Sequence, residues 1–138
     1  MTEERELIRR LAAGRVVYVR AWGTSMLPAI RPGERLRVEP RRGEPARVDE
    51  VVLVAAGGGV RIHRVTAVTG EGGVVTRGDA LRRPDPAVAA AAVLGRVSAN
   101  LQAGPGRRWQ RAPGRLGRWC AMWLPPRLLQ LAARVAGA

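Results

Sequence analysis

The chain has no lysine and no phenylalanine, and it has only one cysteine and one histidine. Because lysine is absent, a catalytic pair of serine and lysine cannot form here. The single cysteine, Cys120, excludes an internal disulfide and a cysteine-rich metal site, and we interpret it as a buried thiol. The single histidine, His63, is then the only side chain poised to change its charge near neutral pH.

The sequence also lacks a long hydrophobic segment. Residues 1–15 are too charged to form the core of a signal peptide. The longest apolar run near the C-terminus, Trp119 to Pro126, lies between Arg118 and Arg127 and falls far short of the ~20 residues that a spanning helix needs. We therefore expect a cytoplasmic or peripheral membrane protein, without a transmembrane span and without a signal peptide.

Acidic residues are few. The sequence has 11 Asp and Glu residues and 24 arginines, so its formal net charge is +13. Arginine replaces lysine throughout, and alanine, glycine and proline are abundant, which indicates a compositional bias. The arginine count alone is therefore weak evidence for nucleic-acid binding, and we do not expect a nucleic-acid partner. The positive charge is still expected to attract anionic surfaces.

Hydrophobic periodicity predicts a mainly β domain with helices only near its ends. A short N-terminal helix begins near Thr2, where acidic residues occupy the first turn, and ends at Gly14. Strands are predicted over residues 15–20, 35–39, 51–56, 60–68, 74–77 and 93–98, with a helical turn within 86–92. Short strands separated by glycine and proline turns favour a barrel or a folded sheet.

A change in composition divides the chain into two regions. The length favours one domain, which we place over residues 1–103, followed by a tail over residues 104–138. Residues 86–138 contain no acid and eight arginines, with tryptophans interleaved in the tail. Leucines between 124 and 135 predict a short amphipathic helix in this tail. Such a segment suits peripheral contact with a membrane, or a tail helix folded onto the domain.

A loop bounded by glycine and proline contains the residue that we predict to be the nucleophile. Ser25 lies in the segment Gly23 to Pro28, between two β-prone runs. A serine on such a turn can present its hydroxyl and its own amide to one point, as a nucleophile and an oxyanion donor require. His63 follows as the one available base, and Asp79 or Asp85 could orient its imidazole. The alternative is a surface turn, a structural histidine and two turn acids.

Four short motifs follow one another in a defined order. They are Ser25-Met26-Leu27-Pro28, His63-Arg64-Val65, Gly78-Asp79 with Asp85 six residues later, and Gly95-Arg96-Val97. Together they resemble the signal peptidase I family, within it the endoplasmic-reticulum and archaeal type, which carries a Ser-Met-x-Pro box, then His-Arg-Val, then Gly-Asp and a further Asp. The resemblance covers about residues 15–98.

This resemblance implies a serine endopeptidase that cleaves a signal or leader peptide, on the folded β-sheet barrel of signal and repressor peptidases. It implies Ser25 as the nucleophile and His63 as the general base. Asp85 is the preferred orienting acid, and Asp79 is a second important acid that holds the site together. No cofactor and no metal ion are implied.

The same resemblance assigns substrate-binding roles to the residues around the nucleophile. The Ser25 amide would be one oxyanion donor, and Met26 and Pro28 would shape a small pocket for the residue before the cut. Gly23 stands where many members of that family have a hydroxyl residue that serves as an oxyanion donor. Thr24 or a backbone amide is then left to replace it. The expected partner is an extended peptide or protein segment that adds alongside a strand edge, with small residues before the cut.

Two other classes of protein remain as alternatives. The first is a regulator related to the repressor-type peptidases, which the absence of lysine and of a helix-turn-helix before Ser25 disfavours. The second is a non-catalytic binding module, attached to anionic lipid or nucleic acid through its arginine-rich tail. The retention of Ser25, His63 and both acids disfavours this second class.

Overall fold

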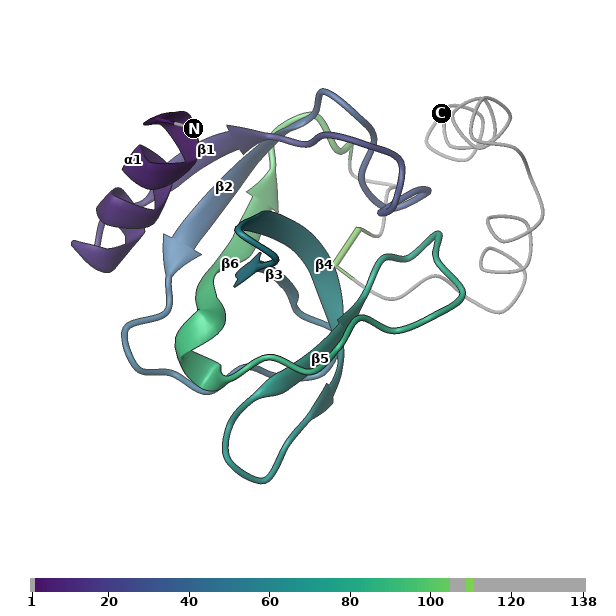
Figure 1. The fold of residues 1–138 in the computed structure, drawn as a ribbon. Coiled ribbons are helices and arrows are strands. Elements are labelled where there is room, and N and C mark those ends of the chain that lie inside the picture. The colour runs from purple at the N-terminus through teal and green to yellow at the C-terminus, as the bar shows by residue number, and fades with distance from the viewer. Residues whose placement is uncertain (1, 105–108, 111–138) are drawn as a thin grey trace.

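The structure is a computed structural model that describes residues 2–104 and 109–110. The described chain begins with one helix and continues with short strands (Figure 1). The elements are α1 (Thr2–Ala12), β1 (Val17–Arg20), β2 (Arg35–Pro40), β3 (Val51–Ala56), β4 (Gly59–Val68), β5 (Val74–Arg77), the short 3-10 helix η1 (Ala90–Ala92) and β6 (Val93–Asn100). Each predicted strand is found, with bounds that differ from the prediction by at most one or two residues.

The strands form one antiparallel six-stranded sheet in the order β1-β2-β6-β3-β4-β5. The prediction of a mainly β domain with a short N-terminal helix is thus confirmed. The sheet does not close into a barrel, because within the described chain its two end strands, β1 and β5, do not pair with each other. Beyond β5 the described residues add only an isolated bridge between Val74 and Val88. The closed barrel that the resemblance implied is therefore wrong. Strand lengths and turns left a barrel or a folded sheet open, because they do not reveal whether the two end strands meet.

A tight turn between β3 and β4 sets the register that matters for the candidate site. Gly57 and Gly58 both adopt positive φ, at 61° and 82°, as a two-residue hairpin turn of the primed type requires. The resulting register pairs Ala56 with Gly59 and continues to Val52 opposite His63. A residue inserted in this turn would move His63 to the other face of the sheet.

Hydrophobic packing covers both faces of the central strand β3. Leu53 belongs to a core cluster on the face that also holds Leu11 of α1 and Ile62. Val52 and Val54 belong to a second cluster on the other face. Because both faces are buried, β3 reads as a continuous apolar run without alternation.

The core also includes a residue from beyond the predicted domain boundary at residue 103. Trp109 is only 7% exposed and belongs to the same cluster as Leu53. The rest of the predicted tail, with its expected helix and membrane contact, lies outside the described residues. No helix in the described part of the chain combines the length and the apolar character needed to cross a membrane.

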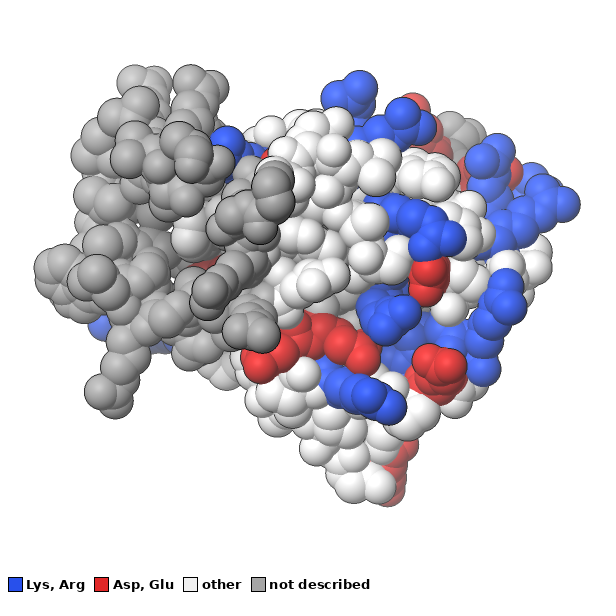
Figure 2. Space-filling model, turned by 180° about the vertical axis from the view of Figure 1, so that it is seen from behind, with Lys and Arg blue, Asp and Glu red and all other residues white. Residues whose placement is uncertain are grey.

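Charged side chains of both signs occupy the surface opposite to the view of Figure 1. Figure 2 shows arginines gathered over one half of this face, with acidic side chains set among them. Ion pairs offset part of the positive charge of the molecule, as between Arg96 and Glu39, whose N–O distance is 3.1 Å.

Candidate active site

The predicted serine loop connects β1 to β2 and is anchored by buried apolar side chains. Gly23 has φ 68°, the left-handed region that glycine enters at little cost. The Leu27 amide donates to the Thr24 carbonyl at 3.2 Å, which closes a turn around Ser25. Leu27 and Ile30 are 0% and 2% exposed, so the core holds the far side of this turn. Ser25 is therefore presented on a fixed loop.

Ser25, His63 and Asp85 form one continuous chain of contacts. His63 Nε2 lies 3.0 Å from Ser25 Oγ, and His63 Nδ1 lies 2.6 Å from Asp85 Oδ2. An ionised carboxylate only accepts hydrogen bonds, so Nδ1 carries the proton and Nε2 of the neutral imidazole is the acceptor. In this tautomer Nε2 can take the proton of the Ser25 hydroxyl. The three side chains come from three segments separated by 38 and 22 residues.

Asp85 is itself held in place by the strand beside it. Thr76 Oγ1 donates to Asp85 Oδ2 at 2.8 Å, and the Asp85 amide donates to the Thr76 carbonyl at 2.7 Å. Thr76 is 1% exposed, so its hydroxyl is fixed by packing. The sequence analysis missed Thr76. The signal for it was a hydroxyl residue two positions after Val74, on the same buried face of β5.

The second predicted acid, Asp79, forms a buried ion pair with Arg64. Its two carboxylate oxygens accept from Arg64 Nε and Nη2, each at 2.9 Å. Both side chains are nearly inaccessible, at 4% for Asp79 and 2% for Arg64. Arg64 also donates to the Asp49 carbonyl at 2.8 Å and to the Trp109 carbonyl at 2.7 Å. This pair therefore joins three segments behind the site.

The Gly78-Asp79 motif packs directly against the serine loop. A Cβ atom on Gly78 would lie 2.6 Å from the Ser25 carbonyl oxygen and 3.0 Å from Ser25 Cβ, so only glycine fits there. The Ala80 amide donates to the same Ser25 carbonyl at 2.8 Å. The end of β5 thus determines how far Ser25 can move from His63.

A cavity of about 650 Å³ opens beside the Ser25 hydroxyl. Gly23, Thr24 and Met26, three of the four predicted substrate-binding residues, line it together with Ser25 and His63. Pro28 is not among the lining residues. It is half-buried and follows the buried Met26 and Leu27, so it belongs to the loop but not to the described cavity wall.

The Ser25 amide is available as a hydrogen-bond donor. It donates to no other group within the described residues. This amide is one bond from the Cα atom of Ser25, which is the arrangement that an oxyanion donor beside a serine nucleophile would require. Thr24 lines the same cavity, so its hydroxyl can reach a bound ligand there.

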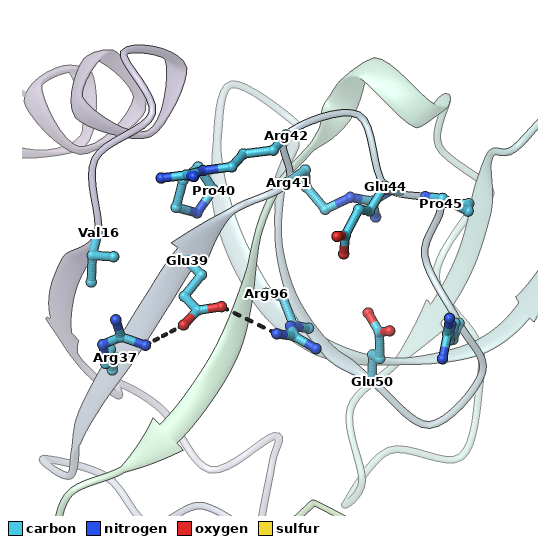
Figure 3. Close-up of a pocket in the computed structure, with 11 residues that line it drawn as sticks. Val16, Arg37, Glu39, Pro40, Arg41, Arg42, Glu44, Pro45, Glu50 and Arg96 are labelled. Carbon is cyan, nitrogen blue, oxygen red and sulfur yellow. Dashed lines mark hydrogen bonds and ion pairs between the residues drawn. The ribbon is translucent and has the colours of Figure 1, made fainter.

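A second cavity, of about 620 Å³, shares no lining residue with the first (Figure 3). Glu39 lies in it between Arg37 and Arg96, and hydrogen bonds from Arg37 and then Arg96 hold the pKa of Glu39 below its ordinary value. Arginines 41, 42 and 47 and Glu44 and Glu50 complete its charged lining. Figure 3 shows charges of both signs facing this space, without a serine or a histidine.

Within the described ranges, no three His, Cys, Asp or Glu side chains are placed to hold a metal ion together. Comparison of the chain with protein-family models, with curated proteins and with solved structures found no match. The geometry of Ser25, His63 and Asp85 is therefore the main basis for assigning a function.

Proposed function

We propose that this protein is a serine endopeptidase of the signal peptidase I type, which cleaves a signal or leader peptide. Ser25 is the nucleophile, His63 the general base and Asp85 the orienting acid. The observation that supports this proposal best is the chain of two hydrogen-bonding contacts from Ser25 Oγ through the imidazole to Asp85 Oδ2, at 3.0 and 2.6 Å. It uses the one histidine of the sequence and a serine on the wall of a cavity.

The first chemical step is attack of Ser25 Oγ on the carbonyl carbon of the scissile peptide bond. His63 Nε2 takes the hydroxyl proton as the new C–O bond forms, and the Asp85 carboxylate stabilises the imidazolium. The negative charge passes to the carbonyl oxygen, which the Ser25 amide stabilises. The imidazolium then protonates the leaving amine, the C–N bond breaks, and an ester on Ser25 remains.

The second step releases the acyl group. A water molecule loses a proton to His63 Nε2 and its oxygen attacks the ester carbon. The imidazolium returns that proton to Ser25 Oγ as the ester bond breaks, so the enzyme recovers its initial state. The overall reaction consumes one water and one peptide bond.

The signal-peptidase-like fold and the buried pair of Arg64 and Asp79 are part of the same proposal. In it, Asp79 acts on catalysis only through position, because Arg64 occupies both of its carboxylate oxygens. Among the described residues, β1 has a strand partner on one side only, so its other edge, which leads into the serine loop, can accept an extended peptide. A substrate strand beside β1 would pass the Ser25 hydroxyl.

A serine-reactive phosphonate probe tests this proposal directly. The chain contains only two serines, so Ser98 on β6 provides a matched control. We expect mass spectrometry to find the label on Ser25 alone. Labelling should be lost in Ser25→Ala and reduced at least ~100-fold in rate in His63→Ala, whereas Ser98→Ala should label normally. Absence of labelling, or equal labelling of the His63→Ala protein, would overturn the proposal.

A further inference from the structure

One charged residue distinguishes the cavity beside Ser25 from an ordinary apolar peptide-binding groove. Apart from His63 and Arg61, its described lining is small, apolar or hydroxyl-bearing, and includes the exposed Trp22 and Leu81. Arg61 is the only arginine in this lining, and the described lining contains no aspartate or glutamate. The cavity therefore offers one fixed positive charge to whatever enters it.

Arg61 is positioned by the same strand that carries the proposed base. It precedes His63 by two residues on β4, so both side chains project from the same face. Arg61 Nε lies 3.4 Å from Asp85 Oδ2, the oxygen that His63 Nδ1 contacts. This approach orients the guanidinium next to the catalytic residues.

The contact with Asp85 leaves much of the binding capacity of Arg61 unused. Asp85 Oδ2 already receives hydrogen bonds from His63 and Thr76, at 2.6 and 2.8 Å. Arg61 Nε is buried without a hydrogen-bond partner, and no described residue accepts a hydrogen bond from the terminal nitrogens of Arg61. The side chain is 26% exposed, so these nitrogens remain reachable from the cavity. A free guanidinium fork is well matched to a carboxylate.

We propose that Arg61 is a specificity-determining residue, which selects peptides with an aspartate or glutamate close to the scissile bond. This inference rests on the proposed peptidase function. Residues two apart on a strand are about 7 Å apart, so the selected acid should lie about two residues from the bond cut at Ser25. A substrate lysine or arginine at that position would meet a like charge in a partly desolvated site and would be disfavoured.

The test uses internally quenched, alanine-rich peptides that carry Glu, Gln or Lys in turn at each position around the cut. For the full-length protein, kcat/KM should be about tenfold or more higher for Glu than for Gln at one position, and lowest for Lys. Arg61→Gln should remove this preference, and Arg61→Lys should keep part of it. Arg47→Gln, which removes an arginine from the second cavity, should keep it in full.

The measured quantity is the ratio of kcat/KM for the Glu peptide to that for the Gln peptide. If Arg61→Gln displaces Asp85, both values of kcat/KM fall together, so a general loss of rate does not change this ratio. Peptides that are cleaved without a Glu preference, or a preference that persists in Arg61→Gln, would overturn this inference and leave the proposed peptidase intact. If no peptide is cleaved, the peptidase proposal fails. Binding of fluorescent Glu and Gln peptides to Ser25→Ala then tests Arg61 by itself, and equal affinities would overturn its role.

Discussion

At the residue scale, the two aspartates that follow β5 have different partners. Asp85 contacts the imidazole of His63 and retains 14% side-chain exposure. Asp79 is bound through both oxygens to the buried guanidinium of Arg64. In the proposed reaction, Asp85 would stabilise the positive charge that His63 gains, whereas Asp79 neutralises the permanent charge of Arg64.

Replacing each aspartate by asparagine should therefore have different consequences. Asp85→Asn should lower kcat by about 10³- to 10⁴-fold, because the imidazole loses the acceptor that fixes its tautomer, and should change stability little. Asp79→Asn should lower the free energy of unfolding by about 3–5 kcal/mol, because it leaves the Arg64 charge buried and uncompensated. Peptide kinetics and urea unfolding measure the two effects. Full activity in Asp85→Asn would contradict the assignment of the orienting acid.

At the element scale, Trp109 joins the segment after β6 to the strand that carries His63. Its side chain is 7% exposed in the core cluster, and its carbonyl accepts a hydrogen bond from Arg64 at 2.7 Å. Arg64 directly follows His63 on β4. The carbonyl of residue 109 therefore helps to satisfy a buried charge next to the proposed base.

Trp109→Ala should lower the free energy of unfolding by about 3–5 kcal/mol, since it opens a large space in a packed core. Trp22→Ala is the matched control, because Trp22 is 52% exposed and its removal opens no interior space. Urea unfolding followed by circular dichroism compares the two variants. Equal stabilities would mean that residue 109 does not pack on the domain in solution.

At the scale of the whole molecule, acidification removes the charges that offset 24 arginines. The pKa of Glu39 is lowered from its ordinary value of 4.5, mainly by its hydrogen bond to Arg37 and then by that to Arg96. A carboxyl whose folded pKa is lowered stabilises the fold above its unfolded pKa, and this stability is lost as the pH falls through the folded pKa. Repulsion among the arginines grows over the same range.

We therefore expect the melting temperature to fall steeply below about pH 4.5 and to recover partly in about 0.5 M salt, which screens the repulsion. Glu39→Gln should lower the melting temperature at pH 7 and should reduce the further loss on acidification. Glu71→Gln, on an exposed turn, should behave like the unchanged protein. Thermal melts of the three proteins at pH 7 and pH 3 measure these effects. If Glu39→Gln melts at the same temperature as the unchanged protein at both pH values, the expectation is contradicted.

Much of the local structure could be predicted because local patterns control it. The helix and the strands were predicted to within a residue or two. The features that placed them are the alternation of side chains, the two glycines before Gly59 and the acidic first turn of α1. The pairing of Ser25 with His63 was also predictable, since the chain has one histidine and no lysine. These predictions need no knowledge of which strands are neighbours.

The sequence by itself preferred Asp85 as the orienting acid but left Asp79 open, because both lie in one loop after the same strand. Only the tertiary structure decides which carboxylate lies beside the imidazole. Arg64 is buried and must be neutralised, and Asp79 lies within reach of it, which leaves Asp85 for His63. The order of the strands, Thr76 behind Asp85 and Trp109 in the core likewise depend on contacts between segments distant in sequence. Such contacts follow from packing and charge neutralisation in three dimensions, which no local pattern records.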